Sequence, residues 1–417
     1  MRRLRGIVLA CVVLAATAEL ALRVGRFGWT PAALGPWSTA PPWDRLRTFD
    51  AAGDPQPIGG AEAAWSLGPG EPVVRYRLNR LGLREEREPA DPAAPGTCRI
   101  LAAGDAYTFG YGVTADDAWP RRLARRLAGE RVEVLNAGFP NLDVEQQRRR
   151  VARLAARLRP DVVVVNFDWW NVPLEAAETA RPPRWSRAWW IANVEQKGAR
   201  LGAHVALADV ALRMARARSG LFPQSGLARE LEPLTVPPAA LASRWARTRA
   251  ALAGMASDAA ASGGHFLLVV TPLDVQVDPR RNALYVEGRL PYPAHGFADV
   301  DYRAARAMPE ALARFTKAND IAVLDLTATF AARPADDLFL PDDYHAGPGA
   351  QGLIAEAVER RLRETGACAL RPTSTVSKNG TAGAGLSPFA STSAAGVGNP
   401  APKMDDSRAS DLARRLR

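Results

Sequence analysis

The sequence predicts an α/β fold in which a five-stranded parallel sheet lies between two layers of helices. Five short apolar runs alternate with longer helical segments, and each run is about as long as one strand. The runs cover 99–103, 132–136, 161–166, 265–271 and 321–325. Strands that alternate with helical crossovers form parallel sheets, which are buried on both faces. A three-layer α/β/α sandwich follows from this alternation.

The helical segments supply the two outer layers. They cover 119–128, 144–158, 239–262 and 302–318, and a last helix covers 349–364. The first apolar run ends at Gly104-Asp105, directly before a short helix-like segment. This turn lies at the carboxyl edge of the predicted sheet, where α/β folds bind their ligands.

The composition is that of a protein with a large core and a basic surface. The chain has 417 residues, of which 47% are hydrophobic and 24% charged, and its formal net charge is +10. Arginine carries most of the positive charge. Two interpretations stay open, namely solvated helix faces and attraction to anionic lipid or acidic polysaccharide. The chain has no nucleic-acid-binding motif, so no nucleic-acid partner is expected.

Motifs for cofactors and metals are missing from the sequence. There is no GxxxxGK phosphate loop, and no cysteine and histidine pair has the spacing of zinc ligands. Gly110 and Gly112 do not complete a dinucleotide fingerprint. The acidic pairs at 116–117 and 336–337 have no supporting ligand set. We therefore expect neither a cofactor nor a metal ion.

Residues 1–22 have the layout of an export signal or a membrane anchor. The basic stretch MRRLR precedes an uncharged apolar segment over 6–18, and Ala16-Thr17-Ala18 offers a cleavage site of small residues. If it is not cleaved, the segment through Leu22 is a short anchor. The anchor is the preferred of the two alternatives. Both place the body of the protein outside the cytoplasm, on the periplasmic or cell-surface side.

Three segments lie outside the regular alternation of the predicted domain, which spans 98–368. Residues 23–97 form an irregular N-terminal extension, with one alternating stretch at 73–84 that predicts a short strand and a turn. Residues 172–238 are inserted after the third strand and form either a lid or a packing elaboration. Residues 369–417 form a low-complexity tail that is expected to be disordered.

Two of the three cysteines are candidates for a disulfide. Cys98 precedes the first strand, and Cys368 follows the last helix. In a doubly wound sheet the closing helix ends near the bottom edge, where the first strand begins, so the two thiols can meet. An oxidising compartment would let them form a disulfide. Two free thiols are the alternative.

Position 106 holds an alanine where the surrounding sequence is typical of a nucleophile. Gly104-Asp105-Ala106 forms the strand-to-helix turn on which α/β hydrolytic folds present a serine. A methyl group has no heteroatom and cannot attack a carbonyl. Far downstream, Asp342 and His345 have the spacing of a catalytic base and its orienting carboxylate.

Together with the motif NRLGLR at 79–84, these residues resemble the SGNH (GDSL) hydrolase family in its bacterial exported or membrane-anchored form. The resemblance covers roughly residues 73 to 365. It implies a flavodoxin-like three-layer fold and the cleavage or transfer of acyl groups on lipids, carbohydrates and other esters. The family's first block is Gly-Asp-Ser, with the serine as nucleophile and its N–H in the oxyanion hole. In this chain the block lacks the nucleophile and keeps only the backbone N–H, which belongs to Ala106.

The next two blocks also depart from the family pattern. NAGFPN at 136–141 resembles Asn-Ala-Gly-x-Pro-Gly, with Asn141 in place of the glycine that supplies an oxyanion N–H. FDWWN at 167–171 resembles Phe-Gly-x-Asn-Asp, and Trp170 then replaces the oxyanion asparagine while Asp168 replaces the glycine. A shift of one residue would instead make Asn171 the donor. Asp105, Asp168 and Trp169 are further candidates for ligand binding.

The block with Asp342 and His345 matches the family, and the resemblance assigns them the carboxylate and the base. Opposite Ala106, however, the imidazole has no hydroxyl to deprotonate. The sequence therefore predicts a protein without esterase activity that keeps a cleft lined by Ala106, Asn141, Trp170 and His345. A cell-envelope polysaccharide or an acyl compound is the expected ligand. An active acyl esterase or O-acyltransferase with an altered site, and an engineered replacement of serine at position 106, stay open as alternatives.

Overall fold

A computed structural model of the chain describes most of the predicted domain and part of the N-terminal region. The described residues are 2–27, 43–51, 53–66, 73–175, 190, 201, 205, 207–208, 231–281, 302–341 and 343–370. Most of the insertion at 172–238, predicted to be a lid or a packing elaboration, and most of the low-complexity tail at 369–417 lie outside these residues.

The central sheet has five parallel strands in the order β6-β5-β7-β8-β9. Their bounds are Cys98–Ala103 (β5), Val132–Asn136 (β6), Val162–Phe167 (β7), His265–Val270 (β8) and Ala322–Asp325 (β9). This is the flavodoxin-like order 2-1-3-4-5. The predicted fold class is confirmed, and each predicted strand differs from the observed one by at most one residue at either end.

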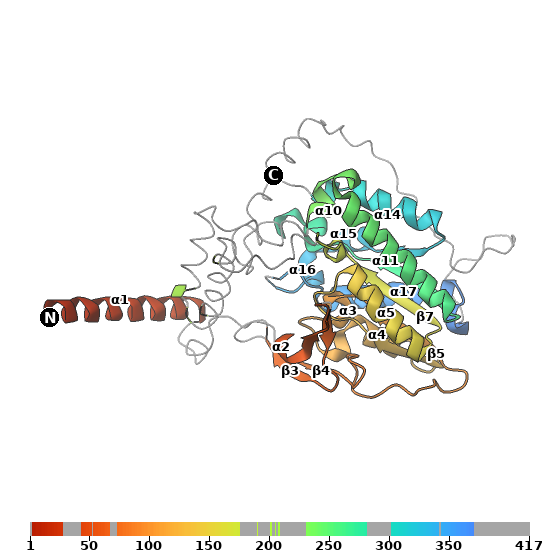
Figure 1. Cartoon of the computed structure of the whole chain (residues 1–417), viewed down its shortest axis with the longest axis horizontal. Coiled ribbons are helices and arrows are strands. Elements are labelled where there is room, and N and C mark those ends of the chain that lie inside the picture. The colour runs from red at the N-terminus through yellow and green to blue at the C-terminus, as the bar shows by residue number, and fades with distance from the viewer. Residues whose placement is uncertain are drawn as a thin grey trace.

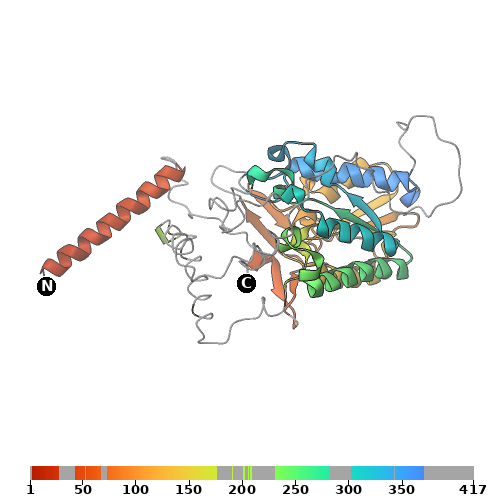
Figure 2. The same cartoon turned by 90° about the horizontal axis from the view of Figure 1, so that it is seen from above.

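Helices cover both faces of the sheet (Figures 1 and 2). On one face lie α5 (Val144–Leu158), α11 (Ala242–Ala261) and α14 (Ala307–Ala318), and on the other lie α4 (Trp119–Arg126) and α17 (Pro348–Glu364). The alternation along β5 separates the two cores. Leu101 and Ala103 pack with the first group, whereas Ile100 and Ala102 pack with the second.

Shorter elements connect these layers. The short helices are α2 (Trp43–Leu46), α3 (Ala106–Phe109), α10 (Glu232–Thr235), α12 (Asp274–Val277), α15 (Thr327–Ala331) and α16 (Ala335–Leu338). Single 3-10 turns cover Ala115–Asp117, Trp169–Asn171, Pro238–Leu241, Pro279–Arg281, Tyr302–Ala304 and Ala367–Ala369. The predicted helix over 302–318 is thus divided into a 3-10 turn and α14. Pro309 has no N–H to donate to Ala305, so α-helical bonding cannot run through from residue 302.

The N-terminal extension contains more regular structure than the sequence predicts. Two antiparallel pairs form there, β1 (Arg47–Phe49) with β2 (Pro55–Pro57), and β3 (Glu62–Trp65) with β4 (Val74–Arg77). Trp65 and Tyr76 from the second pair pack with the segment that follows β5. The description of 23–97 as irregular is therefore too simple, because this hairpin forms one wall beside the end of β5.

The N-terminal helix α1 (Arg2–Phe27) extends away from the α/β body (Figures 1 and 2). Its segment Gly6–Gly25 has 20 residues and a mean hydropathy of 2.2. By length and composition this helix can cross a membrane, and an export signal would have the same properties.

Cys98 and Cys368 are joined by a disulfide with their Cα atoms 5.3 Å apart. Cys98 begins β5, and Cys368 lies in the 3-10 turn after α17. The bond closes a sequence separation of 270 residues at the bottom edge of the sheet, and it joins the two cysteines that the sequence puts forward. Cys11 is free.

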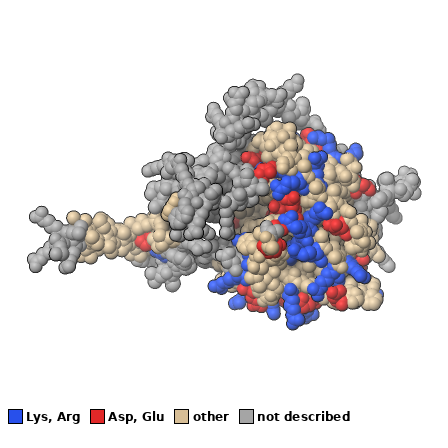
Figure 3. All heavy atoms as spheres, viewed as in Figure 1, with Lys and Arg blue, Asp and Glu red and all other residues tan. Residues whose placement is uncertain are grey.

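Arginine side chains are interspersed with acidic ones over the face that α5 and α11 form (Figure 3). Several ion pairs account for this pattern. They join Arg148 to Asp258, Arg149 to Asp54, Arg157 to Asp91 and Arg247 to Glu145. On this face the pairing favours solvated helix surfaces over a dedicated site for a polyanion.

Candidate functional site

The turn after β5 presents position 106 at the carboxyl edge of the sheet. Gly104 has φ +147°, and a Cβ there would lie 2.4 Å from the Thr108 hydroxyl oxygen, so the turn requires glycine. Asp105 caps α3 by accepting the N–H of Tyr107 at 2.9 Å. Ala106 is the first residue of α3 and is 6% exposed. The backbone of a nucleophile-bearing turn is thus present, with a methyl group at its tip.

Arg84 holds the far end of this turn. Its guanidinium donates to the carbonyl oxygens of Phe109 and Gly110 at 2.6 Å each, and to that of Val113 at 2.8 Å. The group also lies over the Tyr76 ring at 4.8 Å. Burial lowers the pKa of Arg84 to about 10. The last residue of the motif NRLGLR therefore binds the carbonyl groups at the end of α3 and in the turn that follows it.

The second block folds closely against α3. Asn136 accepts the N–H of Gly138 at 3.0 Å, and a Cβ at Gly138 would lie 2.4 Å from the backbone nitrogen of Phe109. Asn141 is exposed and has φ +61°, a left-handed conformation that asparagine tolerates better than most residues. Its role as an oxyanion donor stays a prediction.

In the third block, the structure brings Asn171 rather than Trp170 to the turn. The Asn171 amide donates to Oδ2 of Asp105 at 2.9 Å, and its Oδ1 accepts the N–H of Asp168 at 3.1 Å. The Trp170 ring instead stacks on Tyr344, with centroids 4.6 Å apart. Which of the two residues, Trp170 or Asn171, serves as an oxyanion donor stays a prediction.

Asp105, Asp168 and Trp169, the further candidates for ligand binding, are all buried. Their exposed fractions are 7%, 0% and 2%. Trp169 packs edge-on against Phe167 at 5.5 Å, and the two carboxyl groups contact protein groups. In this structure the three side chains are therefore part of the framework beneath the site, and their binding role stays a prediction.

His345 pairs with Asp343. Oδ1 of Asp343 lies 2.6 Å from Nδ1 of the imidazole and also accepts the backbone N–H of His345 at 2.8 Å. An aspartate that accepts the N–H two residues later forms a turn of its own, which brings the carboxylate to the near ring nitrogen. The sequence predicts Asp342 for this role, and Asp342 lies outside the described residues.

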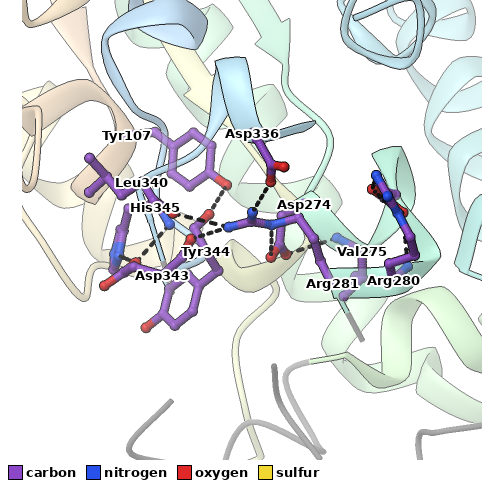
Figure 4. A network of polar contacts seen from close by, with 11 residues as sticks. Tyr107, Asp274, Val275, Arg280, Arg281, Asp336, Leu340, Asp343, Tyr344 and His345 are labelled. Atoms are coloured by element: carbon purple, nitrogen blue, oxygen red, sulfur yellow. Dashed lines mark hydrogen bonds and ion pairs between the residues drawn. The ribbon is translucent and has the colours of Figure 1, made fainter. Parts of the chain in front are cut away.

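Arg281 anchors the loop that carries this pair (Figure 4). Its guanidinium donates to Oδ2 of Asp274 at 3.1 Å, to the carbonyl oxygen of Leu340 at 3.1 Å, and to that of Asp343 at 2.5 Å. Arg281 is 6% exposed and Asp274 is fully buried. Arg281 also pairs with Asp336 at 3.3 Å, so a guanidinium held by two carboxylates fixes the backbone on both sides of the turn before His345.

Aromatic rings enclose the imidazole of His345. Tyr111 stacks on one side at 3.8 Å between centroids, and Tyr344 lies at 4.3 Å. Trp170 extends the series beyond Tyr344, and Trp65 extends it beyond Tyr111 at 4.8 Å. The ring series runs from β3 to the third block, with the imidazole in its middle.

The same contacts bring the turn and the histidine loop together. Tyr107, next to Ala106, donates its hydroxyl to the carbonyl oxygen of Tyr344 at 3.0 Å, and its ring lies 6.3 Å from that of His345 (Figure 4). Asp343, Arg281 and Tyr111 are functional candidates that sequence reasoning misses. The adjacent acidic pair before Tyr344 was a signal for Asp343, whereas Arg281 has no local motif. Among the described residues, no cluster of His, Cys, Asp or Glu is arranged to hold a metal ion.

Comparisons with known proteins add structural neighbours. No model of a known protein family matches the chain, and no curated relative matches it. Three solved structures illustrate the likeness: TesA, with 18% identity; a protein from Desulfitobacterium hafniense described as lipolytic and of the G-D-S-L family, with 15%; and a catalytic mutant of an acetylxylan esterase from Geobacillus stearothermophilus, with 12%.

These matches extend over nearly the whole of each solved structure. They cover 64%, 63% and 69% of this chain and 98%, 99% and 98% of the respective structures, with TM-scores of 0.35, 0.34 and 0.35. By its own strand order the chain has a flavodoxin-like three-layer α/β/α fold, and its sequence blocks keep their resemblance to those of SGNH hydrolases.

Proposed function

We propose that this protein is a membrane-tethered, extracytoplasmic relative of SGNH hydrolases that lacks ester-hydrolase activity and binds a carbohydrate or acyl ligand of the cell envelope. The observation that carries the proposal is the methyl group of Ala106 at the first position of α3, beside a loop that keeps its imidazole and carboxylate. The imidazole has no hydroxyl to activate.

Magnitudes support the loss of activity. Removing the serine from such a catalytic unit costs on the order of 10⁶ in turnover. An altered oxyanion donor costs a further factor of about 10² to 10³ where attack still occurs. The Asp343–His345 pair cannot offset these losses by itself. The rings of Tyr111 and Tyr344, with centroids 3.8 Å and 4.3 Å from that of the imidazole, also restrict the approach of a water molecule to it.

Aromatic groups support the choice of ligand. Trp170 and Tyr344 stack on each other at the edge of the site, and both are only partly buried. Faces and edges of such rings are suited to sugar rings and acyl chains. A binding assay with a panel of envelope glycans and acylated glycans tests this part, with Trp170→Ala as the variant that should lose binding. Unchanged binding by Trp170→Ala would contradict the assignment of this site.

Two observations support the location outside the cytoplasm. Helix α1 is long and apolar enough to tether the chain, and Cys98 and Cys368 form a disulfide, a bond typical of oxidising compartments. Fractionation of the native host, followed by alkylation of the membrane fraction with and without reductant, tests both. A soluble cytoplasmic chain with alkylatable Cys98 and Cys368 would contradict this location.

Ester hydrolysis is tested directly with p-nitrophenyl acetate. We expect the wild-type chain to show only the background rate, and His345→Ala to match it. We expect Ala106→Ser to gain little, because it restores only one of the altered blocks. Robust activity of Ala106→Ser alone would favour an engineered serine replacement. Turnover by the wild type that His345→Ala abolishes would establish an active esterase or O-acyltransferase with an altered site.

A further inference from the structure

Two carboxyl groups lie buried side by side beneath the turn at position 106. Asp105 follows β5 and Asp168 follows β7, and these two strands are neighbours in the sheet. Their side chains hydrogen-bond to each other. Two carboxylates have only acceptors, so a hydrogen bond between them requires that one of the two carries a proton.

The surrounding donors identify which group carries the proton. Both oxygens of Asp105 accept hydrogen bonds at 2.9 Å, Oδ1 from the N–H of Tyr107 and Oδ2 from the amide of Asn171. The Asp168 side chain accepts the N–H of Trp170 at Oδ1 and also accepts the backbone N–H of Asn171. No donor in the described part of the chain reaches its Oδ2. The ionised form therefore suits Asp105, and the protonated form suits Asp168.

Charges near the pair agree with this assignment. His345 and Tyr107 are the other titratable groups that face Asp105, Tyr107 also faces Asp168, and Asp274 and Asp343 face Tyr107. Within the described residues, neither carboxyl group has an arginine or lysine among its main electrostatic partners. Burial, followed by the Asp105 charge, raises the pKa of Asp168 well above its usual range.

We propose that Asp168 is a neutral carboxylic acid at physiological pH, which donates its proton to the Asp105 carboxylate and so ties the end of β7 to the turn after β5. Asp168 is then a positioning residue. Through Asp105 it holds the N–H of Tyr107, which follows Ala106, and it keeps the Asn171 amide directed at the turn. The proposal concerns the framework and holds whether or not the protein hydrolyses esters.

Thermal unfolding of the full-length chain in detergent, measured from pH 5 to pH 8, tests this assignment. Asp168→Asn keeps a donor to Asp105, so its midpoint should lie near that of the wild type at pH 5. Its advantage over the wild type should then grow with pH. The wild-type fold retains a proton that the unfolded chain releases above about pH 4, so wild-type stability falls as the pH rises toward the folded-state pKa. Other titrating groups, Glu85 among them, contribute equally to both proteins and cancel.

Two further variants complete the test. Asp105→Asn removes the anion on which three donors converge, so its midpoint should fall at every pH. Asp320→Asn, at an exposed position with φ +50°, is the matched control and should show no change that depends on pH. A constant difference between Asp168→Asn and the wild type, or a larger loss for Asp168→Asn than for Asp105→Asn, would overturn the proposal.

Infrared spectroscopy provides a second measurement that does not need a folded variant. At pH 9, which is above the pKa of about 7 that Glu85 has in the fold, the wild type should still show the C=O band of a protonated carboxylic acid. This band should disappear when the chain is unfolded. In the folded variants it should be lost in Asp168→Asn and kept in Asp320→Asn. Absence of the band from the folded wild type would also overturn the proposal.

Discussion

The turn after β5 and the loop before α17 meet at one edge of the sheet, but different interactions hold them. At the turn, Arg84 gives all its hydrogen bonds to carbonyl oxygens, and in the described part of the chain it has no ion pair. At the loop, Arg281 forms an ion pair with the buried Asp274 and also binds two carbonyl oxygens. The turn has no nucleophile and the loop has its imidazole, yet both keep the arginine that shapes them. The interactions that shape the backbone of this site are therefore independent of whether a catalytic side chain is present.

Arg281→Met should have the largest effect, because it removes the cation that pairs with the fully buried Asp274 carboxylate. We expect a loss of about 3–5 kcal/mol in the free energy of unfolding, measured by denaturant titration of the full chain. Arg280→Met is the control, since that side chain is 83% exposed, and its change should stay within about 0.5 kcal/mol. The double variant Arg281→Met with Asp274→Leu should recover most of the loss. Equal losses for the single and double variants would show that the ion pair is not what holds the loop.

Arg84→Met should cost less, about 2–3 kcal/mol. The change removes charge-assisted hydrogen bonds to three carbonyl groups, but it also removes the cost of burying a cation whose pKa burial lowers to about 10. No buried charge is left behind. Arg80→Met, at an exposed position of the same segment, should be near neutral in the same titration. A loss greater than that of Arg281→Met would reverse the contrast between the two regions.

Glu85, which follows Arg84, should make the stability of the fold depend on pH. Its Oε1 accepts the N–H of Asn136 at 2.9 Å, and burial raises its pKa to about 7 from an ordinary value of 4.5. The folded state thus binds a proton that the unfolded state releases, so stability falls as the pH rises from about 5 to 7. Glu85→Gln keeps the acceptor and should gain about 2 kcal/mol over the wild type across this range. Parallel stability curves for the two proteins would show that Glu85 titrates normally.

The sequence predicts the sheet well because its signal is local. Five apolar runs between helical segments are enough to predict the strands, and the glycine at 104 marks the turn after β5. The alternating stretch at 73–84 predicts β4, but its partner β3 and hence the hairpin were missed, because β3 is short and lies in a segment with little periodicity. The pairing of His345 was predicted from a family spacing, whereas Asp343 reaches the ring through a local turn. Arg281 is distant in sequence and becomes visible only when the chain is folded.

The smallest change in stability should come from replacing the carboxylate that pairs with His345. The same experiment shows whether Asp343 or Asp342 is that carboxylate. Oδ1 of Asp343 accepts the backbone N–H of His345 and lies 2.6 Å from Nδ1 of its imidazole. The side chains of Asp343 and His345 are 15% and 12% exposed. Asp343→Asn keeps one acceptor oxygen and loses the charge, so the free energy of unfolding should fall by about 1 kcal/mol. The proton on Nδ1 should also exchange faster with water, as seen by NMR of the His345 ring.

Asp342→Asn is the matched neighbour for this experiment. If Asp343 orients the ring, this variant should leave both the stability and the Nδ1–H signal unchanged. The opposite result, a lost signal in Asp342→Asn and a normal one in Asp343→Asn, would return the role to the residue that the Asp-x-x-His spacing predicts. The histidine loop would then match the family pattern in full, and the departure from it would be confined to the turn and the two blocks beside it.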